Sequence, residues 1–212
     1  MNARRLLEWG GVAAGVILIA FGVVAIYMGV DGRSTVRDNL KQEQIYFGDA
    51  TDPAVAKYAD QWAGEQLLTG NQARAFAQIM RTHALEASGE LTYAEMGRFQ
   101  LASDPSNPKG TSDEALAAKD ATGAPIANGA RNTWVTETAL STALNVSYMA
   151  EQLALFGIVV GVALLLTGIG VVVADEDRAR RCGHGSRVTA LDTIGRPWDA
   201  RSACGELPTH AR

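Results

Sequence analysis

Two long uncharged blocks dominate the pattern of hydrophobic and polar positions along the chain. Trp9–Val30 holds 22 residues without a charge, and Gln152–Ala174 holds 23 more. A helix rises 1.5 Å per residue, so each block would form a helix of about 33 Å, long enough to cross the hydrocarbon core of a bilayer. The sequence therefore predicts transmembrane helices at 9–30 and 152–174.

A cleavable signal peptide is the alternative for the first block, because Arg4 and Arg5 give it a basic start. Its apolar stretch is too long for a signal peptide, however, and no small-x-small cleavage pattern precedes Asp31. We expect an uncleaved anchor.

Basic residues near the ends of the two blocks predict the orientation. Arg4 and Arg5 precede the first block. Four more arginines follow the second block: Arg178, Arg180, Arg181 and Arg187. Basic residues beside a span favour the cytoplasmic side of the membrane. A long loop, such as residues 31–151, crosses the membrane largely regardless of its charge. We therefore expect a cytoplasmic N-terminus (1–8), an extracytoplasmic domain (31–151) and a cytoplasmic tail (175–212).

Glycines recur at the same spacing, i, i+4 and i+11, in both blocks. They are the candidate helix-packing residues Gly11, Gly15, Gly22, Gly157, Gly161 and Gly168. This spacing places each set on one helix face, and small residues let helix backbones approach closely in lipid. The pattern predicts that the two spans pack together through these faces, or that they bind another subunit if the faces point outward.

Between the blocks the pattern is helical, which gives an all-α membrane protein: two transmembrane helices in a hairpin with a helical domain inserted between them. The first helix is expected to run on to about Gln44. Capping residues and apolar spacing predict further helices. Their expected ranges are 53–69, 71–88, a short one near 112–119, and a long one from about Arg131 to Ala174.

The long final helix carries an apolar stripe ahead of the second block. Its residues are Val135, Ala139, Ala143, Val146, Ala150 and Leu153. Such a stripe is typical of a helix face that packs on a neighbour. We expect the outer half of this long helix to pack on the outer part of the first helix.

Charge narrows the range of partners. The net charge is −4, and residues 31–151 carry 10 basic and 16 acidic side chains. Nucleic-acid binding needs a basic face, so this domain is not expected to bind nucleic acid. The two blocks contain no titratable acid, base or histidine, which argues against a proton relay within this chain alone. The expected partners are the lipid bilayer and other membrane proteins, or a second copy of the chain.

The tail holds the only two cysteines. With two histidines they form a candidate zinc set: Cys182, His184, Cys204 and His210. The spacing departs from paired zinc knuckles, so free thiols and exposed histidines are the favoured interpretation, and no metal or cofactor is expected. The tail is poor in large apolar residues and is expected to be disordered.

His83 is the one histidine of the middle domain. A catalytic role would require a deep pocket around it and a carboxylate within hydrogen-bond reach. No acid or nucleophile partner is evident in the sequence, so no catalytic residue is predicted.

Several short motifs resemble those of small two-span membrane proteins of actinobacteria, over about residues 5–175. They are Val36-Arg37-Asp38-Asn39-Leu40, Ile45-Tyr46-Phe47, Ala73-Arg74-Ala75-Phe76-Ala77 and Thr92-Tyr93-Ala94-Glu95. The resemblance implies the two-span topology and a bacterial plasma membrane. Members are sometimes labelled ring-opening dioxygenases, but His83 alone could not hold the iron.

Three functions fit these observations. The leading hypothesis is a non-enzymatic structural or accessory subunit that acts through protein–protein contacts. The second is a sensor whose outer domain binds a ligand and signals to the tail, and the third is a cell-envelope enzyme.

Overall fold

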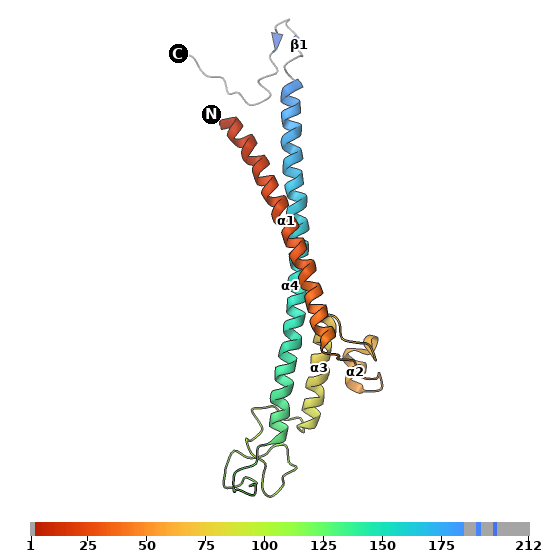
Figure 1. Cartoon of the computed structure of the whole chain (residues 1–212), viewed down its shortest axis with the longest axis vertical. Helices are drawn as coiled ribbons and strands as arrows, with labels where there is room; N and C mark the ends of the chain where they lie inside the picture. Colours follow the sequence, from red (N-terminus) through yellow and green to blue (C-terminus); the bar gives the residue numbers. More distant parts are fainter. Residues whose placement is uncertain (1–2, 185–189, 192–196, 199–212) are drawn as a thin grey trace. The chain divides into compact units, whose positions relative to one another are not determined.

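The structure is a computed structural model that describes residues 3–184, 190–191 and 197–198, with side chains from Trp9 to Glu176. Its helices are α1 (Ala3–Gln42), α2 (Pro53–Tyr58), the 3-10 turn η1 (Asp60–Trp62), α3 (Gly70–Ala87) and α4 (Gly129–His184) (Figure 1). Two two-residue strands, β1 (Ala190–Leu191) and β2 (Pro197–Trp198), pair antiparallel. Apart from that pair, the described secondary structure is helical.

The chain divides into two compact units. The first comprises Met1–Tyr27 and Gly157–Arg212, and the second comprises Met28–Phe156. Both α1 and α4 are long and apolar enough to cross a membrane, with mean hydropathies of 2.4 and 2.7 over their most apolar stretches. The two apolar blocks of the sequence therefore form helices of membrane-spanning length.

The long helices differ at their ends from the expected ranges. α1 ends at Gln42 rather than Gln44, and α4 begins at Gly129, where the Asn128 side chain accepts a hydrogen bond from the Ala130 N–H at 3.1 Å. α4 also continues past Ala174 to His184, so the expected tail starting at Asp175 begins as helix. The expectation of disorder beyond His184 falls outside the described residues, apart from β1 and β2.

In the second unit, α3 lies alongside the first half of α4 (Figure 1). α3 buries a face of small and apolar side chains, since Ala73 is fully buried and Ala84 is only 6 % exposed. The main core gathers side chains from α1, α2, α3, α4 and the intervening loops. Its large members are Leu40, Phe47, Val55, Leu67, Ile79 and Leu144.

The expected helix over 53–69 is wrong beyond Tyr58. The chain leaves α2 at Ala59, makes the turn η1, and then returns beside the segment that follows α1. Leu67 N–H donates to Ile45 C=O at 2.9 Å, and Phe47 N–H donates to Glu65 C=O at 2.9 Å. These bonds to a distant segment replace helical ones and still bury Leu67 completely.

The helix expected over 71–88 starts one residue earlier, at Gly70. Thr69 is the N-cap, and Gln72 completes a capping box by accepting from the Thr69 N–H at 3.0 Å. The Thr69 hydroxyl in turn accepts from the Gln72 N–H at 3.3 Å. Reciprocal capping of this kind satisfies two backbone groups that a helix start leaves open.

The short helix expected near 112–119 does not form. Residues 97–128 instead make a loop region joined by isolated antiparallel bridges, among them Phe99 with Thr111 and Leu101 with Ala117. Asp113 accepts from the Ala115 N–H at 2.9 Å, which favours a turn over a helix at this point. A second apolar cluster of Ala84, Met96 and Trp134 underlies this region.

Candidate functional site

The six glycines singled out in the sequence lie along the line where α1 and α4 meet in the first unit. A methyl group built on Gly161 would lie 2.7 Å from the Gly22 carbonyl and 2.9 Å from the Ile26 nitrogen, and one on Gly168 would lie 2.7 Å from the Gly15 carbonyl. Gly11 faces the Asp175 carboxylate, and a methyl group on Gly157 would lie 3.8 Å from the Ala25 carbonyl oxygen, in ordinary van der Waals contact. The two backbones thus approach each other at glycine positions.

The neighbouring glycines give a contrast. A methyl group on Gly10 of α1 or on Gly170 of α4 would meet no atom within 4 Å. The close approach is therefore specific to one face of each helix, and it excludes a side chain at Gly22, Gly161 and Gly168 without a shift of backbone.

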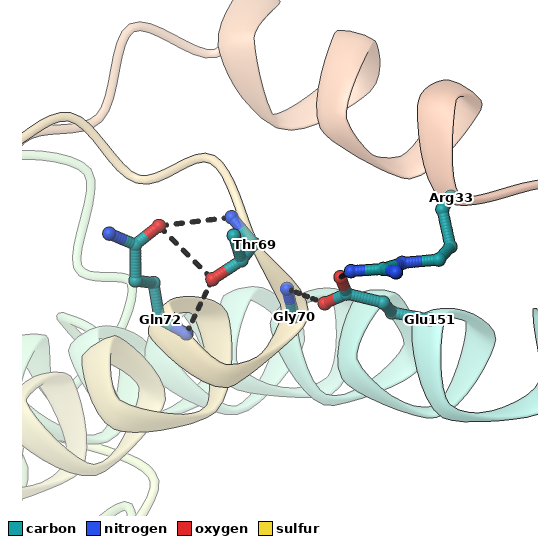
Figure 2. A network of polar contacts seen from close by, with 5 residues as sticks. All are labelled: Arg33, Thr69, Gly70, Gln72 and Glu151. Carbon is teal, nitrogen blue, oxygen red and sulfur yellow. Dashed lines mark hydrogen bonds and ion pairs between the residues drawn. The ribbon is translucent and has the colours of Figure 1, made fainter. Parts of the chain in front are cut away.

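A polar network in the second unit ties three helices together (Figure 2). The Glu151 carboxylate on α4 accepts a hydrogen bond from the Gly70 N–H, the first residue of α3, at 2.5 Å. It also pairs with Arg33 of α1 at 3.3 Å. A carboxylate at a helix N-terminus is stabilised by the open N–H groups and by the helix dipole. Glu151 therefore fixes the start of α3 against α1 and α4.

His83 lies on α3 and pairs with Asp52, the N-cap of α2, with 3.0 Å between His83 Nε2 and Asp52 Oδ2. The other carboxylate oxygen accepts from the Ala54 N–H at 2.8 Å. That backbone hydrogen bond is the main reason why the pKa of Asp52 lies below its usual value. Desolvation raises the pKa, and the nearby charge of His83 lowers it again. This pair could not be predicted from the sequence, because Asp52 lies 31 residues from His83 and its local pattern indicates only a helix cap.

His83 also borders a groove of about 590 Å³ between α3 and α4. The groove wall combines apolar side chains, such as Met80 and Leu140, with Thr136 and the carboxylate of Glu137. Glu137 is only 4 % exposed and accepts from the Ser141 hydroxyl at 2.5 Å. Asp52 supplies a carboxylate within hydrogen-bond reach of His83, but the groove is open and is not the deep pocket that a catalytic histidine would require. Within the described residues, no hydroxyl or thiol hydrogen bonds to His83.

α4 buries the mixed face that carries Glu137 and leaves its apolar stripe exposed. Trp134, Glu137 and Leu144 are buried, at 6 %, 4 % and 5 % exposure. The apolar stripe of the sequence is instead exposed, with Val135 at 51 % and Val146 at 58 %. The apolar stripe thus stays exposed, and the outer half of α4 meets the outer part of α1 through other residues: Glu151 pairs with Arg33 at 3.3 Å, and Leu144 shares the main core with Leu40. The buried face contacts α3, as the hydrogen bond from Ser141 to the Ala77 carbonyl shows.

The side chains of the four candidate zinc ligands lie outside the part of the chain whose side chains the structure describes. Cys182 and His184 lie in the last turn of α4, where side chains are not described, and Cys204 and His210 lie outside the described residues. Over the described part of the chain, no group of three or more His, Cys, Asp or Glu side chains is placed to hold a metal ion.

Comparisons of the chain with family models, with curated proteins and with solved structures found no match.

Proposed function

We propose that the chain is a non-enzymatic structural or accessory subunit of a bacterial plasma membrane that acts through protein–protein contacts. Two transmembrane helices form a hairpin, both termini lie in the cytoplasm, and residues 31–151 form a helical domain on the outer side. The helix lengths and hydropathies and the flanking arginines support this arrangement.

One observation carries the proposal: α4 exposes large apolar side chains in the part of the helix that precedes the second span. Val135, Val146 and Met149 are 51 %, 58 % and 67 % exposed. Contiguous apolar surface in an aqueous domain is typical of a protein interaction site. The resemblance to two-span actinobacterial membrane proteins is consistent with this role but assigns no chemistry.

The network around Glu151 supports the same function. By joining α1, α3 and α4 within the second unit, it holds the exposed face of α4 in a fixed position. A binding surface that is ordered before its partner arrives loses less conformational entropy on association.

The test is purification of the tagged full chain in mild detergent, with mass spectrometry of the proteins that co-elute. A stoichiometric partner, or a multiple of the chain's own mass, is expected for the native sequence and is expected to be lost in Val146→Lys. Gln78→Lys on α3, also at an exposed position, is the matched control. A chain that elutes alone as a monomer would contradict the proposal.

Ligand sensing is the second candidate, and the groove beside His83 is the observation that favours it. Its mixture of apolar wall and buried Glu137 is typical of a small-molecule site. Native mass spectrometry of the full chain from its own membranes would show a bound small molecule, and Thr136→Trp, which fills the groove, would remove it. An unchanged spectrum in Thr136→Trp would argue against this candidate.

A further inference from the structure

The exposed apolar face of α4 has the spacing of a coiled-coil seam. Its positions alternate by four and three residues and are all exposed. They are Val135, Ala139, Thr142, Val146, Met149 and Leu153, which we call the α4 seam. A 4-3 alternation of apolar residues places one row of side chains along a supercoiled helix pair, where each side chain enters a gap of the facing helix.

The opposite face of the same helix is already occupied. Glu137, Leu144 and Glu151 are spaced seven residues apart and are directed into their own domain, where Leu144 joins the main core and Glu151 binds the start of α3. The rotation of α4 about its axis is therefore fixed, and the α4 seam is presented outward along about 27 Å of helix.

We propose that the α4 seam binds the same seam of a second copy of this chain in a parallel two-stranded coiled coil. This inference rests on the proposed function, for which it names the partner. Two copies anchored in one membrane have the same orientation, so their α4 helices run parallel, and a two-fold axis brings each seam residue opposite its own counterpart.

The residues beside the seam favour an identical partner. The flanking positions are Thr136, Thr138, Ala143, Asn145, Ala150 and Gln152, none of which carries a charge. In coiled coils, charged residues at these flanking positions usually determine which helices pair. Like charges at these positions on two identical parallel helices would repel each other. The first charged neighbour, Arg131, instead lies over the Tyr93 ring at 4.1 Å.

Three polar groups on or beside the seam have partners within their own helix. The Thr142 hydroxyl donates to the Thr138 carbonyl at 2.7 Å, the Thr136 hydroxyl donates to the Asn132 carbonyl at 3.2 Å, and the Asn145 amide donates to the Ser141 carbonyl at 2.8 Å. Each of these three groups therefore keeps a hydrogen-bond partner when a second helix covers the seam. Burial of unpaired donors would otherwise cost about 1–3 kcal/mol each.

There is also room for a second helix beside the outer end of the seam. Val135, Ala139 and Thr142 line an open apolar groove of about 550 Å³, together with Tyr93 and Trp134. A seam of fewer than three heptads is marginal for helices free in water, but confinement of both copies to one membrane raises their effective concentration.

The test is disulfide cross-linking in native membranes, with single cysteines in a full chain carrying Cys182→Ser and Cys204→Ser. Oxidation is expected to link Val146→Cys and Met149→Cys into dimers, because identical seam positions face each other at disulfide distance. Leu140→Cys is the control: it is 46 % exposed but lies off the seam, on the wall of the His83 groove. It is expected to stay monomeric.

Two results would overturn the proposal: equal cross-linking at 140, 146 and 149, which indicates random collision, or no cross-linking at 146 and 149. A second measurement then separates this failure from that of the proposed function. If the native chain co-purifies with a different protein and Val146→Lys loses it, the surface binds a foreign partner and only self-association fails. If nothing co-purifies with the native chain, both fail.

Discussion

Substitution of Gly161 by alanine is expected to weaken the pairing of α1 with α4, whereas the same change at Gly170 is not. Both glycines lie on α4, nine residues apart. The added methyl group at Gly161 would lie 2.7 Å from the Gly22 carbonyl oxygen and 2.8 Å from Ile26 Cγ1, but at Gly170 it would meet nothing within 4 Å. The two variants therefore differ only in whether a neighbouring helix occupies the space.

The magnitude follows from two opposing terms. Replacing glycine by alanine in a helix favours the helix by about 1 kcal/mol, and this gain is common to both positions. Overpacking against atoms that cannot move freely costs about 1–3 kcal/mol, and it applies to Gly161 alone. The helix-propensity gain cancels in the comparison, so Gly161→Ala should pair less stably than Gly170→Ala by about 1–3 kcal/mol.

Separation of the two helices can be measured by energy transfer between dyes on Trp9→Cys and Val173→Cys, both at exposed positions of the first unit. The full chain, with Cys182 and Cys204 replaced by serine, is titrated with a denaturing detergent in mild bicelles. The detergent concentration at which half of the chains have separated α1 and α4 is expected to be lower for Gly161→Ala than for Gly170→Ala. Equal concentrations, or a lower one for Gly170→Ala, would refute packing through the glycine faces.

Three further predictions concern the second unit. Glu151→Gln keeps an acceptor for the Gly70 N–H but removes the charge, so it should lower the free energy of unfolding of this unit by about 1 kcal/mol, the difference between a charged and a neutral hydrogen bond, as measured by thermal unfolding against Glu43→Gln. Asp52 has a lowered pKa in the folded chain, so its stabilising contribution is complete above the ordinary aspartate pKa of about 3.9 and is lost as pH falls below it. The free energy of unfolding should therefore fall less steeply between pH 6 and pH 3 in Asp52→Asn than in the native chain, and an identical slope in the two chains would refute this. Asn128, 4 % exposed, donates to the Gly97 and Pro108 carbonyls at 3.1 and 2.9 Å, so Asn128→Ala should speed hydrogen exchange throughout 97–128, and unchanged exchange would refute its anchoring role.

The elements that could be predicted from the sequence are those whose cause is local. Long apolar runs and a regular stripe with end caps indicate α1, α3 and α4. The segments that departed from prediction, 59–69 and 112–119, are held by backbone hydrogen bonds to distant parts of the chain, such as Leu67 to Ile45 and Ala118 to Gln100. Local spacing contains no information about such partners.

The two faces of α4 show a further limit. The sequence offers an apolar stripe through Val146 and a mixed one through Glu137 and Ser141, and hydrophobicity alone favours burial of the first. The fold buries the second, because Glu137 and Ser141 satisfy each other by a hydrogen bond and Trp134 adds apolar area. The glycine faces differ from this case, because the spacing of the glycines alone places each set on one face of its helix. The role of Glu151 could not be foreseen, because Gly70 lies 81 residues away.

The membrane topology is tested most directly by labelling single cysteines in intact cells with a membrane-impermeant maleimide. Ser106→Cys places a thiol at an exposed loop position of the second unit, and the native Cys182 and Cys204 serve as internal controls in the parent chain. The topology predicts that Ser106→Cys reacts in intact cells, whereas Cys182 and Cys204 react only after lysis. Labelling of the two native cysteines in intact cells, with Ser106→Cys protected until lysis, would contradict it.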